Sequence, residues 1–289
     1  MRILLTGVTG FIGSHLLKRL QQEQHGLAVL VRPGTDTKNL DANVIVDSGQ
    51  VAQVAEQIAG FQPDAVIHLA SCFIAQHKPE DIDQLVESNV TFPTRLLEAM
   101  QLADCKTLIN TGTSWQHFEN NEKRPVNLYA ASKQAFECMA RYYSDAHGMK
   151  VVNLKLYDTY GSGDTRPKLF ATLKRIASSG ESLAMSPGAQ LIDILHVDDV
   201  VDAYCVCLQK LPDLPQWSSY AISSGKPLPL TELVAAFEQA TGKKLNIDFG
   251  AREYRPREVM VPWNTGQTLP GWRPLIDLQT GIKRYLDAE

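Results

Sequence analysis

The strongest structural signal in this chain is its N-terminal stretch, Arg2-Ile3-Leu4-Leu5-Thr6-Gly7-Val8-Thr9-Gly10-Phe11-Ile12-Gly13. An apolar run is followed directly by spaced glycines, and Leu16, Leu17 and Leu20 then recur at helical spacing. This order predicts a buried strand, a tight turn and a helix. Glycines at such a turn let the backbone approach a pyrophosphate, whose charge faces the free N–H groups at the positive helix end. The spacing G-x-x-G-x-x-G is one residue longer in its first gap than the usual dinucleotide fingerprint, but its strand–turn–helix setting favours a dinucleotide cradle.

The rest of the first half repeats this order of strand and helix. Apolar runs rich in β-branched residues alternate with amphipathic stretches, a pattern typical of βαβ units and a parallel sheet. Pro93 should kink or divide the third of the helices. We therefore predict an α/β fold, a doubly wound parallel sheet of the Rossmann type. The expected strands are 2–6, 27–31, 44–46, 65–69, 107–110 and 151–156, and the expected helices are 14–22, 51–58, 79–100 and 129–147.

The local amino-acid composition of the sequence changes after Gly161. Proline, glycine and serine come closer together at 161–190 and 211–230. We interpret this change as the start of a second, smaller unit. The prediction is a Rossmann dinucleotide-binding domain over 1–160 and a smaller C-terminal substrate lobe over 161–289, of which 191–224 returns to the Rossmann sheet.

Composition argues against several classes of function. The 289 residues carry 28 Lys and Arg against 32 Asp and Glu, a net charge of −4, so nothing attracts the chain as a whole to nucleic acid. No apolar run reaches the about 20 residues of a membrane span and no secretory leader is recognisable, so we expect a cytoplasmic protein without a membrane partner. The five cysteines form no C-x-x-C pair and the seven histidines no H-E-x-x-H motif, which favours reduced thiols and no metal site.

The end of the second expected strand bears on the choice of cofactor. A carboxylate about 20 positions after the glycines would hydrogen-bond the ribose of NAD, whereas an arginine accommodates the 2′-phosphate of NADP. The strand 27–31 is followed by Arg32 and Pro33, and the next carboxylate is Asp36. We therefore predict that Arg32 lies over the adenosine and that NADP(H) is preferred, with NAD(H) as the alternative.

A tyrosine and a lysine stand one helical turn apart in Tyr129-Ala130-Ala131-Ser132-Lys133. At i and i+4 both side chains lie on one face of a helix, so the ammonium can sit near the phenol. A phenol with its ordinary pKa of about 10 is a poor base at neutral pH, and a nearby cation lowers that pKa. Y-x-x-x-K is common by chance, but here it opens a helix beside the expected crevice of the sheet. We predict that Tyr129 is the catalytic acid/base and that Lys133 is its partner.

A hydroxyl is expected beside that phenol to orient a substrate oxygen. The run Asn110-Thr111-Gly112-Thr113-Ser114-Trp115 ends the strand 107–110 at the carboxyl edge, where doubly wound sheets bind ligands. Thr113 is the first choice for this role, and Ser114 and Thr111 are the alternatives.

Six segments of the chain resemble the extended short-chain dehydrogenases/reductases, in the NAD-dependent epimerase/dehydratase branch that acts on nucleotide sugars. Any one segment is a modest match, whereas six in the family's order are specific and extend over nearly the whole chain. The C-terminal lobe matches more loosely, through 255–258 and 269–272. The segments are TGVTGFIG at 6–13, PDAVIHLAS at 63–71, SNVTFPTRLLEA at 88–99, YAASK at 129–133, LYDTYGSGD at 156–164 and DILHVDDVVDAY at 193–204.

The resemblance implies roles for individual residues. It makes Lys133 a ribose ligand, and it puts Asp47 near the adenine and Asn89 near the nicotinamide. Together with the glycine motif, the expected cofactor-binding residues are Gly7, Thr9, Gly10, Phe11, Ile12, Gly13, Arg32, Asp47, Leu69, Ala70, Ser71, Asn89, Thr111 and Lys133. The expected substrate-binding residues are Thr113, Ser114, Asp158, Lys168 and Arg255, of which Arg255 resembles a retained diphosphate-binding arginine.

The chain also departs from the family's pattern. Asp158 stands where the family has an asparagine before x-Y-G, and Ile192 replaces the usual arginine before D-x-x-H-V. Arg166 or Lys168 would then supply the missing positive charge. The 4,6-dehydratases of the family place an Asp-Glu pair beside the catalytic threonine, and no such pair follows Thr113. Dehydratase activity is therefore not expected.

The runs NTGTSWQ, YAASK and DTYG are most similar to the CDP-abequose/paratose-type 4-ketoreductases. The resemblance therefore implies an NAD(P)-dependent enzyme that reduces a 4-keto group of a nucleotide-activated deoxysugar, with Tyr129 as proton donor. One alternative is an NAD-dependent nucleotide-sugar epimerase, and another is a non-catalytic, cofactor-binding regulatory protein. Relatives commonly dimerise through the helices that correspond to 79–100 and 129–147, so a homodimer is expected.

Overall fold

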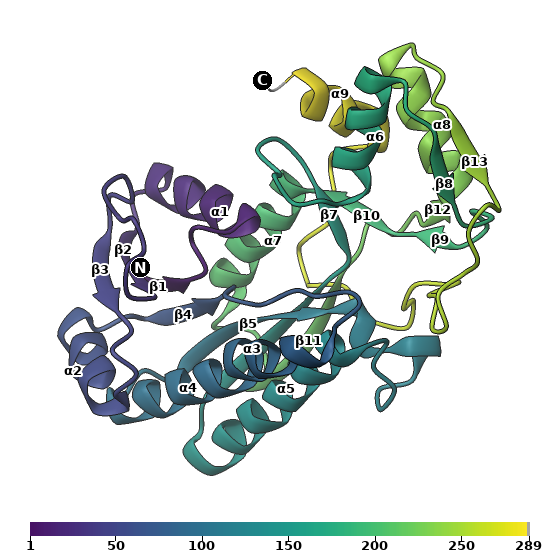
Figure 1. The fold of residues 1–289 in the computed structure, drawn as a ribbon. Helices are drawn as coiled ribbons and strands as arrows, with labels where there is room; N and C mark the ends of the chain where they lie inside the picture. The colour runs from purple at the N-terminus through teal and green to yellow at the C-terminus, as the bar shows by residue number, and fades with distance from the viewer. Residues whose placement is uncertain (288–289) are drawn as a thin grey trace.

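The computed structural model describes residues 1–287, and its centre is a seven-stranded sheet with helices on both faces (Figure 1). The strand order is β11-β6-β5-β4-β1-β2-β3, and every pairing within the sheet is parallel. This arrangement confirms the predicted doubly wound α/β fold. The strands are β1 (Arg2–Thr6), β2 (Gly26–Val31), β3 (Asn43–Val46), β4 (Ala65–His68), β5 (Thr107–Thr113), β6 (Lys150–Leu156) and β11 (Trp217–Ile222).

Helices cover both faces of the sheet. On one face α1 (Phe11–Gln22) packs beside α7 (Val197–Lys210), and on the other lie α2 (Val51–Phe61), α4 (Phe92–Leu102) and α5 (Leu128–His147). Because both faces are covered, a central strand such as β4 is buried at every residue. This explains why the strands read as apolar runs rather than as alternating patterns.

The direction of the chain changes at β1, which lies between β2 and β4. In a doubly wound sheet, such a switch point opens a crevice beyond the carboxyl ends of the two strands. Thr6 and His68 are paired in register there, and the Thr6 Oγ1 lies 2.8 Å from the His68 Nδ1. The residues that follow these two strands, Gly7 and Leu69, therefore meet at the expected ligand edge.

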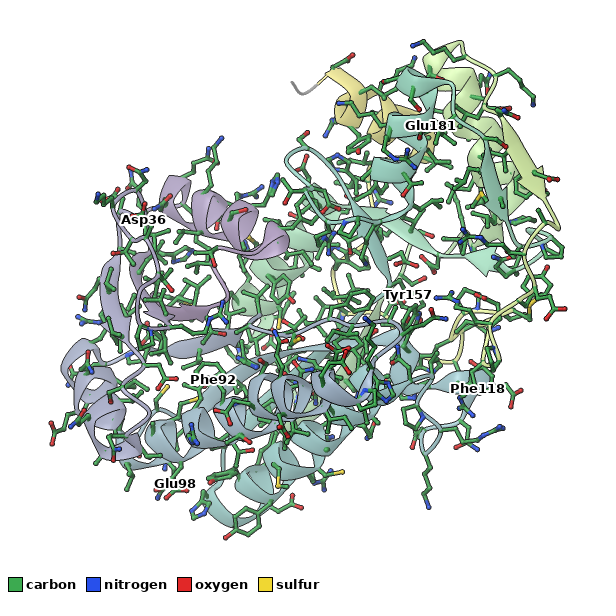
Figure 2. All side chains as sticks on the ribbon, in the orientation of Figure 1. Asp36, Phe92, Glu98, Phe118, Tyr157 and Glu181 are labelled. Atoms are coloured by element: carbon green, nitrogen blue, oxygen red, sulfur yellow. The ribbon has the colours of Figure 1, made fainter. Side chains whose placement is uncertain are left out.

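The C-terminal part forms a lobe with a core of its own (Figure 1). Tyr157, which directly precedes β7, lies where the sheet and the lobe meet (Figure 2). The strands of the lobe form pairs, namely β7 (Asp158–Tyr160) with β10 (Ile194–His196), β9 (Leu191–Ile192) with β12 (Leu228–Pro229), and β8 (Leu183–Met185) with β13 (Ile247–Phe249). Its helices are α6 (Leu169–Ser179), α8 (Leu230–Thr241) and α9 (Leu278–Asp287).

The segment 191–224 is divided between the two parts. Its strands β9 and β10 pair within the lobe, whereas α7 packs on the sheet and β11 pairs with β6 at the sheet's edge. Only the second part of the segment thus joins the sheet. The short apolar run at 191–196 predicts a strand but does not specify the partner of that strand.

The helix expected at 79–100 is broken into shorter segments. It consists of a 3₁₀ turn at Pro79–Asp81, α3 (Ile82–Val86), a π-helical turn at Glu87–Thr91 and then α4. Pro93 has no N–H to donate to the carbonyl of Asn89, which favours a local change of helical geometry before the proline. Asn89 lies in the widened turn and is buried. None of the helices in residues 1–287 is long and apolar enough to cross a membrane.

Candidate active site

The turn between β1 and α1 requires glycine. Gly7 has a φ of +73°, and a Cβ there would lie 2.5 Å from the backbone nitrogen of Ala70. A Cβ on Gly13 would lie 2.1 Å from the carbonyl oxygen of Gly7. Gly10 precedes α1 without a side-chain cap, so the N–H groups of the first turn, from Phe11 to Gly13, stay available to an anion. The turn therefore combines close backbone approach with free donors, as a pyrophosphate site requires.

Gly13→Ala should weaken dinucleotide binding about tenfold or more, the effect of losing one strong hydrogen bond. Its methyl group would clash with the carbonyl of Gly7, so we also expect the free energy of unfolding to fall by about 1–3 kcal/mol. Quenching of tryptophan fluorescence by NADPH and unfolding in urea measure the two effects. Gly60→Ala, in α2 and with open space at its Cβ, is the matched control. Unchanged cofactor binding in Gly13→Ala would show that the cradle lies elsewhere.

A cavity of about 400 Å³ opens at this turn and follows the carboxyl ends of β1, β2 and β4. Its volume and its position at the switch point suit an extended ligand. The predicted cofactor residues that line it are Gly7, Thr9, Gly10, Arg32, Asp47, Leu69, Ala70 and Ser71. Among the lining residues that were not predicted are Val8, Thr35 and Cys72.

The end of β2 carries a cation and no carboxylate. Arg32 is exposed, lines the cavity beside Thr35 and has no ion-pair partner among the residues that the structure describes. Asp47 reaches the same cavity from the end of β3, where its Oδ1 accepts the Gly49 N–H at 2.9 Å. Glu87 also lines the cavity, and its carboxylate is paired with Arg95 at 3.1 Å. The cavity therefore presents an unpaired guanidinium and two carboxylates that are each engaged within the protein.

Tyr129 lies beside the loop that separates this cavity from a second one. Its ring meets the ring of Phe73 edge-on, with centroids 4.9 Å apart, and Ser71 of the same loop is close enough to affect the pKa of its phenol. Ser71 lines the cavity at the glycine turn, whereas Phe73 lines the cleft beside the lobe. Burial raises the pKa of Tyr129 to about 12, against the opposing effects of Ser71 and Arg166. The phenol is therefore a proton donor at neutral pH.

Lys133, one turn further along α5, is a buried ammonium without a partner. The residue is 2 % exposed, and its Nζ makes no hydrogen bond within residues 1–287. Burial lowers the pKa of Lys133 to about 8, although the charge of Glu137 opposes this. The sequence predicted that this ammonium lowers the pKa of Tyr129, but burial of the phenol dominates and Arg166 supplies the nearby positive charge instead.

The site fits a nicotinamide dinucleotide. The free N–H groups at the start of α1 suit the pyrophosphate, and the orphaned ammonium of Lys133 needs acceptors such as ribose hydroxyls. A buried donor without an acceptor is costly to a folded protein, so a ligand that completes it would recover that cost. Gly7, Gly13 and Lys133 would hold the cofactor, which supplies hydride chemistry when it is bound.

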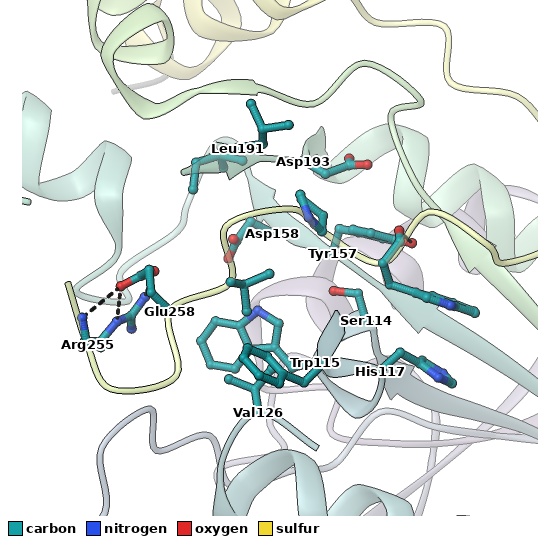
Figure 3. Close-up of a pocket in the computed structure, with 15 residues that line it drawn as sticks. Ser114, Trp115, His117, Val126, Tyr157, Asp158, Leu191, Asp193, Arg255 and Glu258 are labelled. Carbon is teal, nitrogen blue, oxygen red and sulfur yellow. Dashed lines mark hydrogen bonds and ion pairs between the residues drawn. The ribbon is translucent and has the colours of Figure 1, made fainter. Parts of the chain in front are cut away.

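The three candidate hydroxyls have different environments. Thr113 ends β5, and its Oγ1 accepts the Trp115 N–H at 3.3 Å, which leaves the hydroxyl proton free. Ser114 is buried and lines a small pocket beside the cleft (Figure 3). The Thr111 hydroxyl instead lies 2.7 Å from the hydroxyl of Tyr204, a contact within the protein. Thr113 and Ser114 are therefore better placed than Thr111 to meet a ligand.

Asn89 is bound on all sides by protein atoms. Its Oδ1 accepts from the Ser71 hydroxyl at 3.0 Å and from the Cys72 N–H at 2.9 Å. Its Nδ2 donates to the Cys72 carbonyl at 2.9 Å and to the Ser132 hydroxyl at 3.0 Å. Asn89 thus fastens the loop after β4 to α5, and it bears on the cavity through Ser71.

A second cavity, of about 450 Å³, lies between the sheet and the lobe. Phe73 and Trp115 line it from the sheet side, with ring centroids 5.8 Å apart. Lys168 comes from the lobe, where its Nζ lies 4.9 Å from the Phe73 ring centroid and 3.4 Å from the Asp158 Oδ1. Aromatic rings and a cation thus face each other across the cleft.

The other predicted cations are paired with carboxylates. Arg255 donates to both carboxylate oxygens of Glu258, at 2.8 and 3.0 Å (Figure 3). Arg166 is bound to both oxygens of Asp164, at 2.6 and 2.7 Å, and faces the ring of Phe11. Of the two substitutes for the missing arginine at position 192, Lys168 lines the cleft and Arg166 does not.

Two aromatic residues of the cleft were not predicted. Phe73 lies five residues after the end of β4 at His68, and Trp115 lies two residues after the end of β5 at Thr113. Their positions just after two neighbouring strands are the signal that could have found them, because the carboxyl ends of parallel strands share one edge. Phe73 contacts both Trp115 and Tyr129, so it connects the cleft with the candidate proton donor.

Comparison with known proteins adds to this geometry. The model of the NAD dependent epimerase/dehydratase family matches residues 3–222. The chain is 28 % identical to the CDP-abequose synthase of Salmonella muenchen, over 100 % of this chain and 98 % of the relative. It is 26 % identical to the enzyme of the same name from Salmonella typhimurium, over 98 % and 97 % of the two chains.

Among solved structures, the UDP-glucose 4-epimerase of Thermus thermophilus in complex with NAD superposes with a TM-score of 0.82 and 25 % identity, covering 100 % of this chain and 98 % of that one. The UDP-glucuronic acid 4-epimerase of Bacillus cereus has the same fold, with a TM-score of 0.86, 20 % identity and the same coverage. Since the family model extends over most of the chain, this protein is an extended short-chain dehydrogenase/reductase enzyme of the NAD-dependent epimerase/dehydratase family.

Proposed function

We propose that this enzyme uses NADPH to reduce a keto group, at C4, of a nucleotide-activated deoxysugar. The position of Tyr129 carries the proposal. Its phenol lies against the loop that separates the cavity at the glycine turn from the cleft beside the lobe. A carbonyl bound in the cleft would meet a proton donor at the boundary with the cofactor cavity.

The residues of this chain would divide the work between them. Tyr129 is protonated at neutral pH, because burial holds its pKa at about 12, and it would deliver its proton to the carbonyl oxygen. Thr113 would hold that oxygen with its free hydroxyl proton, and Lys133 would hold the cofactor. Bound NADPH supplies the hydride that completes reduction of the carbonyl to an alcohol.

The lobe would bind the nucleotide end of the substrate. Lys168 and Arg255 line the cleft, each paired with a carboxylate that a diphosphate could displace. The proposal therefore assigns cofactor binding to the domain over 1–160 and substrate binding to the lobe over 161–289. Asp158 would then take part through its contact with Lys168.

The two alternatives to the reductase are an epimerase and a regulatory protein, and known relatives support the epimerase. The CDP-abequose synthases support the reductase, whereas the epimerases of known structure support an NAD-dependent nucleotide-sugar epimerase. A non-catalytic, cofactor-binding regulatory protein would have no use for the Tyr129–Lys133 pair.

Absorbance at 340 nm separates these three functions. We expect NADPH to be consumed in stoichiometric amounts when the enzyme is mixed with a CDP- or UDP-linked 4-keto-6-deoxyglucose. Isomerisation of a nucleotide sugar with no net change at 340 nm would establish the epimerase and overturn the reductase. Cofactor binding with no turnover of these substrates or of UDP-glucose would favour the regulatory function.

Arg32→Gln should lower kcat/KM for NADPH about 10- to 100-fold and leave kcat/KM for NADH nearly unchanged, since a charged hydrogen bond contributes about 1.5–3 kcal/mol. The reason is that Arg32 is unpaired and lines the cofactor cavity. Steady-state rates with each cofactor measure the change. Arg273→Gln, at another exposed arginine, is the control. Equal losses with both cofactors, or a higher efficiency with NADH in the unmodified enzyme, would refute the NADP preference.

We also propose that two copies of the chain associate through α3 and α5. The two helices expose large apolar side chains, which supports a contact between copies. The mass in solution, measured by light scattering, tests this association. The exposed residues are Ile82, Val86, Met139 and Tyr142.

A further inference from the structure

A buried glutamine joins the end of β5 to α5. Gln116 is 0 % exposed, and its Oε1 accepts the backbone N–H of Thr113 at 2.9 Å. Its Nε2 donates to the Gln134 Oε1 at 3.0 Å and to the Glu137 Oε2 at 2.6 Å. Gln134 directly follows Lys133, and Glu137 lies one turn beyond it. One side chain thus connects the candidate substrate-orienting threonine with the helix that carries Tyr129 and Lys133.

Glu137, which accepts the hydrogen bond from Gln116, is also held in place by a lysine. The Glu137 Oε2 lies 2.9 Å from the Nζ of Lys155, a residue that is 2 % exposed. The same Nζ lies 2.9 Å from the Nε2 of His117. Burial and the charge of Lys155 lower the pKa of His117 to about 3, so the imidazole is neutral and accepts from the ammonium. The carboxylate of Glu137 is therefore a fixed acceptor rather than a mobile one.

The strand leaves room for the glutamine at Gly112. A Cβ on Gly112 would lie 2.8 Å from the Gln116 Oε1 and 3.1 Å from the Cγ of Lys155. The backbone of Gly112 lies outside the region that demands glycine, so the requirement is for space alone. Gly112 and Gln116 are therefore complementary, and a methyl group at position 112 should displace the amide.

We infer that Gln116 is a positioning residue, which sets the distance between Thr113 and Tyr129. The inference rests on the proposed function, in which these two side chains hold one carbonyl oxygen. They come from different elements, a strand end and a helix, and an error of about 1 Å in such a geometry can lower the rate by about 100-fold. Without Gln116, both the Thr113 N–H and the Glu137 carboxylate lose a partner.

Steady-state kinetics of Gln116→Met and Gly112→Ala test the inference. We expect each variant to lower kcat by about 10- to 100-fold, with KM and the Kd of NADPH changed by no more than about twofold. The double variant should be no slower than the slower single variant, because both act on the same amide. Gln57→Met, at an exposed glutamine of α2, should have the rate of the unmodified enzyme.

Gln116→Glu serves as a second variant. It keeps an acceptor for the Thr113 N–H but sets a second carboxylate against Glu137, so its kcat should also be low. If Gln116→Met does not fold, Gly112→Ala and Gln116→Glu carry the test. A normal kcat in Gly112→Ala, or a fall in kcat that is matched by an equal weakening of NADPH binding, overturns the positioning role while the proposed function stands. Full activity in Tyr129→Phe would overturn the assignment of Tyr129 as proton donor, and isomerisation without consumption of NADPH by the unmodified enzyme would overturn the proposed function.

Discussion

Tyr129→Phe should abolish turnover, with kcat lower by about 10²- to 10⁴-fold, the range that a positioned general acid contributes. The change removes only the hydroxyl, and the ring can keep its edge-on contact with Phe73 at 4.9 Å. The cavity at the glycine turn is lined by other residues, so the Kd of NADPH should stay nearly unchanged. Stopped-flow or steady-state reduction measures kcat, and fluorescence titration measures the Kd.

Tyr142→Phe is the matched control for this prediction. Tyr142 lies on the same helix but is 60 % exposed, so its variant should react at the normal rate. If Tyr129→Phe keeps its activity, the proton comes from another group and the assignment of Tyr129 is wrong. If it loses activity and cofactor affinity together, the hydroxyl serves binding rather than proton transfer.

The doubly wound sheet could be predicted because its signals are local. β1 and β4 are covered on both faces, so they appear in the sequence as unbroken apolar runs. The glycines of the first turn are required by contacts within that turn and with the residue after β4. Each of these features is readable without knowledge of distant partners.

The irregular turn before α4 and the pairing of the lobe strands depend on residues that are distant in sequence, so they could not be predicted in the same way. The π-helical turn at Glu87–Thr91 directs Asn89 towards Cys72 and Ser132, which are remote in sequence. The apolar run at 191–196 pairs with 228–229 and 158–160 rather than with the sheet. The local pattern specifies a strand or a helix, whereas packing selects its partner.

The candidate site could be predicted where the residue types and their spacing in the sequence indicate a role. Tyr129 and Lys133 are one helical turn apart, and Thr113 ends the expected strand. The environment of these groups was not predictable, because it follows from burial. Lys133 loses its solvent without gaining a partner, and Gln116 reaches α5 only in the folded chain.

Lys133→Met should make the protein without cofactor more stable while it removes most of the activity. The ammonium is buried and unpartnered, and its pKa falls from 10.5 to about 8. A shift of this size corresponds to a cost of up to about 3 kcal/mol at pH 7, where both the folded and the unfolded chains carry the proton. Removal of the charge recovers part of this cost. Urea unfolding at pH 7 measures the gain, and steady-state kinetics measure the loss of activity.

The pH dependence of the free energy of unfolding tests independently whether the Lys133 ammonium destabilises the folded protein. Between pH about 8 and 10.5 the unfolded chain still holds the Lys133 proton while the folded chain has lost it, so the stability of the unmodified protein rises with pH there. The advantage of Lys133→Met should therefore be largest below pH 8 and disappear towards pH 10.5. Saturating NADPH should raise the Tm of the unmodified protein more than that of the variant, because the cofactor provides the acceptors that Lys133 lacks.

Lys155→Met separates this effect from the general consequence of removing a buried lysine. Lys155 is as buried as Lys133, each being 2 % exposed, but its Nζ is paired with Glu137 at 2.9 Å. Its removal strands a carboxylate in the interior and should destabilise the protein by about 3–5 kcal/mol. The two substitutions are chemically identical and are expected to have opposite signs. A loss of stability in Lys133→Met at pH 7 would mean that its ammonium already has a partner in the protein without cofactor, and the argument for a ligand-completed site would fail with it.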